Sequence, residues 1–378
     1  MSAGGRGRIV IVSGSVGAGH DGVAFELANR LRDLGHQVEV LDLLRGFPVA
    51  VRVLLGSGYV LTVRTAPWVY ELTCWLVERS GLFQRLASRV CESAAPWLLP
   101  RVQHADLVVA TYPPAGRALG ALRASGRLAV PVATYLTDPA PNYLWVHPAV
   151  EAHLTVDAAA AQETCERYGV AAVAAGPLVD RAFRTTDRAA ARIGTRRSLG
   201  LAPDARVALV LLGSLGIGHV GEAVDALVAA GLVPVVLCGR NERLQRRVRS
   251  HRGAIGLGWR DDVPALVMGA DLVVHNAGGL SLTESLVAGI PAVTFASLPG
   301  HGRANARSLE RSGAAPWARS SAELTTLAAE LTAPASWGGR RPWPVEEETA
   351  TERISALADA GRRQTVAPAA PPPATCSG

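Results

Sequence analysis

Lysine is absent from this chain: all 38 basic side chains among its 378 residues are arginine. Enzymes that form a Schiff base, enzymes that use pyridoxal phosphate and P-loop proteins of the Walker type all depend on a lysine amine. The absence of lysine therefore excludes these three classes. Any phosphate that the protein binds has to be held by arginine, by backbone amides or by helix ends.

Metal-binding and disulfide patterns are also missing. The sequence has no Asp-x-Asp pair and no His/Cys set with zinc spacing, so it predicts no metal and no cofactor. Its five cysteines are an odd number without a Cys-x-x-Cys pair, which indicates reduced thiols. Neither a secretory leader nor an apolar run of about 18 residues is found. We therefore expect a cytoplasmic protein, either soluble or peripheral on the inner face of the plasma membrane.

The length and the order of apolar segments predict two α/β domains. At about 150 residues per domain, 378 residues suggest two. Short apolar strands alternate with helical patterns along the chain, which is typical of parallel, doubly wound sheets. In such sheets ligands bind at the carboxyl ends of the strands. The expected fold is thus two Rossmann-like domains facing each other across a cleft.

The predicted strands of each domain are separated by helices. Those of the first domain are Arg8–Val12, Gln37–Leu41, Leu107–Ala110, Ala133–Leu136 and Ala152–Val156. Those of the second are Val207–Leu212, Val233–Leu237, Ala254–Gly256, Leu272–Val274 and Ala292–Phe295. The domains are predicted as residues 1–180 and 181–345, with Pro177–Leu201 as the junction. A last helix is expected over 346–364 and a disordered tail over 365–378.

Residues 45–101 concentrate positive charge and aromatic rings. They hold seven arginines against three glutamates and include Trp68, Tyr70 and Trp75. Such a mixture with aliphatic residues is typical of a surface that dips into a lipid headgroup layer, although apolar helical stripes also pack on ordinary cores. The net charge of +6 favours anionic partners. No nucleic-acid module accompanies it, so an anionic membrane surface is the expected partner and nucleic acid is not.

A glycine-rich turn follows the first predicted strand. The order Gly14-Ser-Val-Gly17-Ala-Gly19-His20 places backbone amides and a positive helix end where an anion or a sugar hydroxyl can bind. His20 at this mouth is a candidate general base, because an imidazole accepts a proton near neutral pH. The alternative is that His20 only caps the helix.

A second glycine turn opens a helix in the second domain. Asn276-Ala-Gly278-Gly279-Leu-Ser281 lets backbone amides approach a diphosphate, and Glu284, one turn later, can accept hydrogen bonds from ribose. A tight turn without a ligand would give the same pattern. Two further strand ends carry glycines in the same domain, and arginines in this domain are candidate phosphate partners. These additional residues are Gly213, Ser214, Arg240 and Arg260.

Six motifs in this order resemble one enzyme family over about residues 8–330. Besides the two glycine turns they are Thr137-Asp138-Pro-Ala-Pro-Asn142-Tyr-Leu-Trp145-Val-His147-Pro148, Cys238-Gly239-Arg240-Asn241, Gly258-Trp259-Arg-Asp261-Asp262-Val-Pro264 and Pro299-Gly300-His301-Gly302-Arg303-Ala-Asn305. They are similar to those of monogalactosyldiacylglycerol synthase and the processive diacylglycerol glucosyltransferases, and more distantly to the N-acetylglucosaminyltransferase of peptidoglycan lipid intermediates. The resemblance implies a GT-B fold and an inverting, metal-independent transfer from a UDP-sugar to a hydroxyl of a lipid or a specialised metabolite.

The resemblance also implies roles for single residues. His20 would be the base, with Asp138 orienting it or sharing its role. The diphosphate would lie on Gly278, Gly279 and Ser281. Further donor contacts would come from Gly258 and Trp259 (uracil), Glu284 (ribose), and His301 and Asn305 (sugar), together with Gly213, Ser214 and Arg240. Acceptor or membrane contacts would come from Gly17, Gly19, Trp68, Tyr70, Trp75, Asn142 and Trp145.

Two departures from the family pattern affect substrate choice. Relatives usually carry Gly-Gln-Glu where this chain has Gly300-His301-Gly302, and a histidine where it has Asn142. Two other functions stay open: a UDP-N-acetylglucosamine 2-epimerase, which needs no acceptor, and a non-catalytic protein that binds nucleotide sugars.

Overall fold

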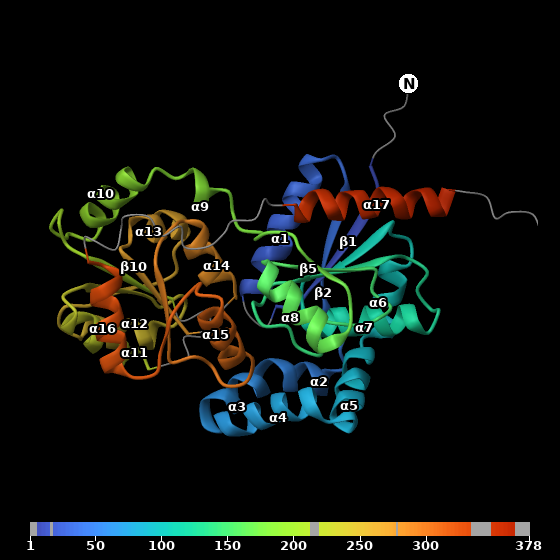
Figure 1. Ribbon diagram of the computed structural model, residues 1–378, viewed down its shortest axis with the longest axis horizontal. Helices are drawn as coiled ribbons and strands as arrows, with labels where there is room; N and C mark the ends of the chain where they lie inside the picture. The colour runs from blue at the N-terminus through green and yellow to red at the C-terminus, as the bar shows by residue number, and fades with distance from the viewer. Residues whose placement is uncertain (1–5, 16–17, 212–218, 277–278, 334–348, 367–378) are drawn as a thin grey trace, which may run out of the picture.

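Two parallel six-stranded sheets form the centres of two α/β domains in the computed structural model, which describes residues 6–15, 18–211, 219–276, 279–333 and 349–366. The strand orders are β2-β1-β3-β4-β5-β6 and β12-β11-β10-β7-β8-β9. Figure 1 shows the two domains side by side, with helices on both faces of each sheet. The predicted fold class is confirmed.

The strands agree closely with the predicted segments. The N-terminal sheet contains β1 (Arg8–Ser13), β2 (Gln37–Asp42), β3 (Leu107–Ala110), β4 (Val132–Leu136), β5 (Ala152–Thr155) and β6 (Ala172–Ala174). The C-terminal sheet contains β7 (Val207–Leu211), β8 (Val233–Leu237), β9 (Ile255–Leu257), β10 (Leu272–His275), β11 (Ala292–Phe295) and β12 (Trp317–Ala318). The prediction missed β6 and β12, and it placed β9 one residue too early. These three strands have two or three residues each, too few to show a period in the sequence.

The helices of the N-terminal half precede residue 180, and those of the C-terminal half follow it. The first group is α1 (Ala18–Asp33), η1 (Leu43–Gly46), α2 (Val49–Val53), η2 (Leu54–Gly58), α3 (Tyr59–Thr65), α4 (Pro67–Arg79), α5 (Gly81–Glu92), α6 (Ala95–Val102), α7 (Pro113–Ala124) and α8 (Ala158–Tyr168). The second is α9 (Ala182–Thr185), α10 (Arg188–Ser198), α11 (Val220–Ala229), α12 (Glu242–Arg249), α13 (Val263–Gly269), α14 (Gly279–Val287), α15 (His301–Arg311), α16 (Ser321–Leu331) and α17 (Ala350–Val366).

Both faces of the strands are buried, which explains their continuous apolar sequences. In β1, Ile9 and Ile11 pack into one hydrophobic cluster, whereas Val10 and Val12 pack into another on the opposite face. The first cluster continues through the junction and into the C-terminal sheet. The two domains therefore share apolar contacts near the junction.

The predicted junction Pro177–Leu201 is more structured than the sequence indicated. It contains α9 and α10, and α10 packs against α13 of the C-terminal domain. Before α9 the chain is tied to α1, because Arg30 donates to the carbonyl of Val179 at 2.6 Å. The division predicted near residue 180 lies between this tie and α9.

The last helix returns to the N-terminal domain. The amides of Thr349 and Ala350 donate to the carbonyl of Ala175, and Ser355 bonds to the buried ring of His36 at 2.7 Å. Figure 1 shows α17 lying along the N-terminal domain. The helix begins at residue 350 and ends at Val366, so residues 365–366 of the predicted tail are helical and the remainder lies outside the described residues.

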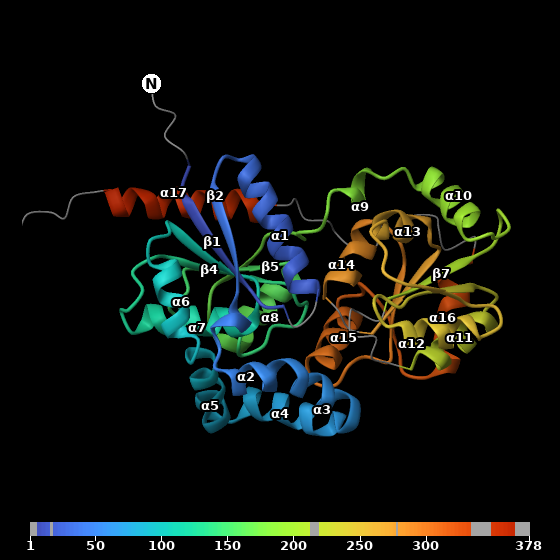
Figure 2. The same cartoon turned by 180° about the vertical axis from the view of Figure 1, so that it is seen from behind.

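Helices α2 to α5 with η2, residues 49–92, form an arm that projects from the N-terminal domain (Figures 1 and 2). The arm bends at Ala66, which leaves the helical conformation (φ −142°), and Pro67 starts α4. No described helix is by itself long and apolar enough to cross a membrane; Val49–Thr65 and Pro67–Arg79 pass such a test only as a pair, bent by 119°.

Candidate active site

A cavity of about 1730 Å³ lies between the two domains and the arm. Its walls come from the start of α1, the loop that follows β4, the inner faces of α4 and α5, and the first turns of α14 and α15. These are the carboxyl ends of strands in both sheets, where doubly wound domains bind ligands. The cavity thus lies where the sequence predicted a cleft.

His20 lies in the first turn of α1 and lines this cavity. Its Nδ1 is 3.1 Å from the hydroxyl of Thr137, and its ring meets Tyr112 edge-on at 5.3 Å. Burial lowers the pKa of His20, and the nearby charge of Asp138 partly opposes that shift. The imidazole is therefore neutral at neutral pH, which is the form that accepts a proton.

Asp138 does not contact His20 in the way the resemblance implied. Its two oxygens accept from the indole of Trp145 and the amide of Asn305, each at 3.1 Å. Thr137 contacts the imidazole of His20 instead, and Asp138 acts on that ring through its charge. The prediction that Asp138 orients His20 or shares its role stays a prediction, since each carboxylate oxygen that accepts one bond can still accept another.

Trp145 is fully buried, so the prediction that it contacts an acceptor or a membrane is wrong. It serves as a donor to Asp138. Asn142, by contrast, lines the cavity, and its side-chain oxygen accepts from the amide of Leu144 at 3.1 Å. Gly19 also lines the cavity.

The loop after β4 is the contact between the domains. Asn305 of α15 donates to Asp138 and accepts from the amide of Ala140, while Ser308 donates to the carbonyl of Pro139. Asn305 is buried by these contacts and lies outside the cavity lining. Its predicted contact with the donor sugar stays a prediction.

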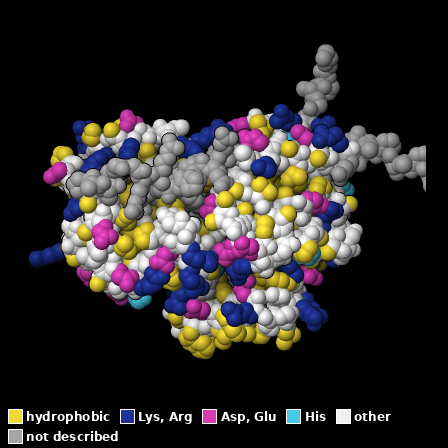
Figure 3. Space-filling model, in the orientation of Figure 1, with side chains coloured by type: hydrophobic (Ala, Val, Ile, Leu, Met, Phe, Trp, Pro, Cys, Tyr) yellow, Lys and Arg dark blue, Asp and Glu magenta, His cyan; other side chains and the backbone are white. Residues whose placement is uncertain are grey.

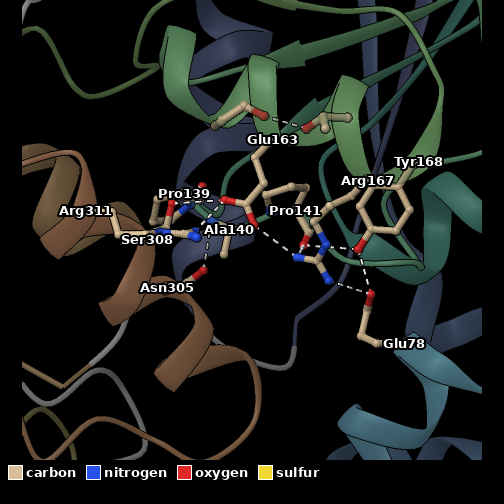
Figure 4. A network of polar contacts seen from close by, with 12 residues as sticks. Glu78, Pro139, Ala140, Pro141, Glu163, Arg167, Tyr168, Asn305, Ser308 and Arg311 are labelled. Carbon is tan, nitrogen blue, oxygen red and sulfur yellow. Dashed lines mark hydrogen bonds and ion pairs between the residues drawn. The ribbon is translucent and has the colours of Figure 1, made fainter.

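A second set of contacts joins α15 to the arm through α8 (Figure 4). Glu163 accepts from Arg311 of α15 at 3.0 Å and from Arg167 at 3.1 Å. Arg167 and Tyr168 then both reach Glu78 of α4, at 3.0 and 2.7 Å. Because Glu78 and Arg311 belong to different domains, these bonds hold the cavity walls together.

The first turn of α14 approaches the loop after β4 very closely. A Cβ on Gly279 would lie 2.4 Å from the carbonyl oxygen of Thr137, so only glycine fits there. Ser281 and Glu284 of the same helix line the cavity. The predicted contacts of Gly17, Gly213, Ser214 and Gly278 lie outside the described residues.

Burial and the neighbouring carboxylate of Asp180 raise the pKa of Glu284 from 4.5 to about 8. A raised carboxyl pKa stabilises the folded protein below pH 4.5, and this contribution is lost as the pH rises toward 8. Glutamine stays neutral at every pH. The free energy of unfolding of Glu284→Gln, relative to that of the wild type, should therefore rise by at least about 1 kcal/mol when the pH is raised from 5 to 9. Melting curves at both pH values check this; a difference that does not change with pH would contradict it.

Arg240, Gly258 and Trp259 lie outside the cavity lining. The side chain of Trp259 is 57% exposed, with the guanidinium of Arg240 stacked 4.9 Å from its ring centre. Arg260 pairs with Asp262, so its predicted role as a phosphate partner is not supported by its position. The first turn of α14 thus lines the same cavity as His20, whereas Arg240, Gly258 and Trp259 do not line it.

Tyr70 lines the cavity, so its predicted contact with an acceptor or a membrane stays a prediction. Its hydroxyl is 2.8 Å from Nδ1 of His301. Trp68 and Trp75 are exposed on the arm, at 68% and 50%, as a membrane-facing role requires. Sequence reasoning gave no role to Thr137 or Tyr112, which lie one residue after β4 and two residues after β3.

The described residues contain no group of three or more His, Cys, Asp or Glu side chains that could hold a metal ion.

Residues 20–172 match the family model for monogalactosyldiacylglycerol (MGDG) synthase. Two processive diacylglycerol β-glucosyltransferases, from Bacillus cereus and Bacillus mycoides, are 23% and 24% identical to this chain over 330 residues. Each alignment covers 84% of this chain and 83% of the relative.

Solved glycosyltransferase structures superpose on almost the whole chain. MurG of Acinetobacter baumannii gives a TM-score of 0.51 at 17% identity and covers 94% of each chain. TcCGT1 in complex with UDP gives 0.59 at 12% identity, covering 95% of this chain and 99% of that one. The fold is GT-B. The resemblance read from the motifs is confirmed, and the GT-B cleft is the cavity that holds His20.

Proposed function

We propose that this GT-B protein is an inverting glycosyltransferase that moves a hexosyl or N-acetylhexosaminyl unit from a UDP-sugar to a hydroxyl of a diacylglycerol-like lipid. The observation that carries the proposal is the position of a neutral imidazole, His20, in the same cavity as the first turn of α14. His20 would supply the base and the first turn of α14 the anion site, which are the two groups that such a transfer needs.

In this reaction the acceptor hydroxyl attacks the anomeric carbon of the donor while His20 takes its proton. A new C–O bond forms on one face of the sugar, and the bond to the β-phosphate oxygen breaks on the other, so the configuration inverts. The electron pair leaves with UDP. The positive end of α14 stabilises the departing diphosphate, with no metal required in this scheme. Glu284 is placed to hold the ribose, since it lies one turn into that helix.

An apolar acceptor fits the half of the cavity that the arm forms. Apolar residues form much of the lining there, beside the polar Thr62, Glu71, Thr73, Glu78 and Arg79. The apolar residues are Leu54, Leu55, Tyr59, Val69, Val77 and Val90 of the arm, together with Leu144 of the loop after β4. A hydrocarbon chain gains about 0.8 kcal/mol for each CH₂ that is buried in such surroundings. This favours a lipid over a polar sugar or peptide as the acceptor.

The outer surface of the arm suits a peripheral contact with a membrane. Nine of the fifteen exposed large hydrophobic side chains of the described residues lie on it: Val49, Val53, Leu54, Leu61, Trp68, Leu72, Trp75, Leu82 and Leu86. Figure 3 shows hydrophobic side chains (yellow) gathered at the end of the arm, with basic side chains (dark blue) beside them. An apolar centre with cationic edges is typical of proteins that lie on anionic lipid.

The membrane contact predicts a loss of vesicle binding in the double variant Leu61→Ser/Trp68→Ser. Each side chain removed from lipid should cost about 1.5 kcal/mol or more, so binding should fall at least tenfold. Ile193→Ser is the matched control, because Leu61 and Ile193 are both 63% exposed but Ile193 lies on α10. Sedimentation with phosphatidylglycerol/phosphatidylcholine vesicles measures the effect. Equal pelleting of the double variant and the wild type would contradict the membrane contact.

The donor class is tested by thermal unfolding with UDP, UDP-glucose, UDP-galactose, UDP-N-acetylglucosamine, GDP and dTDP. A ligand that binds only the folded protein raises the midpoint, by about 2.7 kcal/mol of stability at 100 times its Kd. The proposal expects a rise with the uridine nucleotides that the other two do not produce. No rise with any uridine nucleotide would refute it.

A further inference from the structure

The arm and the C-terminal domain meet inside the cavity, where the rings of Tyr59 and Tyr70 both lie beside the ring of His301. Tyr70, on α4 of the arm, has its hydroxyl 2.8 Å from Nδ1 of His301, the first residue of α15. The two rings are edge-to-face, with their centres 5.7 Å apart. Residues that are 231 positions apart in the sequence are thus joined across the cleft.

The backbone next to this pair is fitted to α4. Gly300 has a positive φ of 66°, and a Cβ there would lie 2.6 Å from Sγ of Cys74 and 3.1 Å from the ring of Tyr70. Just beyond, Arg303 forms an ion pair with Glu71. The start of α15 is therefore in close contact with the arm on both sides of His301.

His301 faces the site of the proposed reaction. It lines the cavity, and it lies close enough to Asp138 and His20 for both to affect its pKa, which burial lowers. A sugar that is bound between His20 and the first turn of α14 would lie in the same cavity as this ring. Since Nδ1 is taken by Tyr70, the ring atom left for a ligand is Nε2.

The hydrogen bond between Tyr70 and Nδ1 couples the position of the ring proton of His301 to Tyr70. Burial raises the pKa of Tyr70 well above its ordinary value, so its hydroxyl keeps its proton. The imidazole of His301 is neutral because burial lowers its pKa. When the hydroxyl donates to Nδ1, the single ring proton has to be on Nε2. His301 then presents an N–H donor to the cavity.

We propose that Tyr70 is a positioning residue of the donor site: it holds His301 so that Nε2–H donates to a hydroxyl of the transferred sugar. This rests on the proposed function. A residue of the arm, which contacts the acceptor side, thereby contributes to the choice of the donor sugar. The hydrogen bond is lost in Tyr70→Phe, which keeps the ring and its packing.

The experiment compares Tyr70→Phe with the wild type by calorimetry, using UDP, UDP-glucose, UDP-galactose and UDP-N-acetylglucosamine. Tyr143→Phe is the control, because it also removes one tyrosine hydroxyl, but Tyr143 lies outside the cavity lining and its hydroxyl bonds to Ser88 and Arg117. We expect Tyr70→Phe to bind UDP within twofold of the wild type. The UDP-sugar that the wild type binds most tightly should bind about fivefold more weakly or worse.

A double-variant cycle distinguishes an effect of Tyr70 that acts through His301 from a general disturbance of the site. If Tyr70 acts through His301, the variant Tyr70→Phe/His301→Ala should bind that UDP-sugar no more weakly than His301→Ala alone. Unchanged sugar binding in Tyr70→Phe would overturn the inference, and so would an equal loss of UDP and UDP-sugar affinity. A wild type that binds no uridine nucleotide would overturn the proposed function itself, which is a different result.

Discussion

His20→Ala should lower the rate of sugar transfer by about 10²–10⁴-fold, the range that a positioned general base contributes. UDP should still bind within about twofold of the wild type, because the base contacts the acceptor and not the nucleotide. Thr137→Val is the companion variant. It keeps the imidazole and removes only the hydroxyl 3.1 Å from Nδ1, so its loss should be much smaller.

The pH dependence of kcat/KM provides a second test of the same residue. Burial lowers the pKa of His20 below 6.5, so the base is already free at pH 7. The value of kcat/KM should be constant near neutral pH and should fall only when the pH drops below the pKa of an ordinary histidine. The residual rate of His20→Ala should lack this acid limb. A transfer rate in the folded variant equal to that of the wild type would rule out His20 as the base.

Asp138→Asn should lower transfer by about 10–100-fold and also reduce thermal stability. Both carboxylate oxygens accept hydrogen bonds, from Trp145 and Asn305, and the amide of asparagine would turn its NH₂ toward one of these donors. A buried donor left without an acceptor costs about 1–3 kcal/mol. The negative charge that supports the protonated forms of His20 and His301 would also be lost.

Asp21→Asn is the matched control for Asp138→Asn. Asp21 also raises the pKa of His20, but less than Asp138 does, and its carboxylate accepts from Ser13 rather than from the other domain. We expect less than a fivefold change in transfer for this variant. If the two variants lost activity equally, the contact between the domains at Asp138 would not explain the loss of transfer activity in Asp138→Asn.

The fold was predictable because parallel strands that are buried on both faces have continuous apolar sequences. β3, β8 and β11 match their predicted ranges at both ends. The arm was harder to predict, because some of its aromatic side chains lie on the surface and others line the cavity. Trp68 and Tyr70 are two positions apart on the same helix, so they point in different directions, one to the surface and one to His301.

In the candidate site, residues within short sequence motifs could be predicted, whereas contacts between residues far apart in the sequence could not. Glycine turns and His20 could be found because each lies at a strand end within a short motif. The partners of Asp138 could not, because Asn305 lies 167 positions away and the bond exists only when the domains face each other. The same holds for Tyr70 and His301. Contacts across the cleft depend on domain placement, which no local pattern encodes.

The most direct test of the central claim is the release of UDP from a UDP-sugar with and without vesicles that contain diacylglycerol, with mass spectrometry of the lipid. The account predicts that UDP and glycosylated lipid form in equal amounts, that neither forms without the acceptor, and that His20→Ala slows the formation of both by about 10²–10⁴-fold. An epimerised sugar nucleotide formed without any acceptor would contradict it and identify an epimerase. Tight binding of UDP-sugar without turnover on any lipid or small hydroxyl acceptor would contradict it as well.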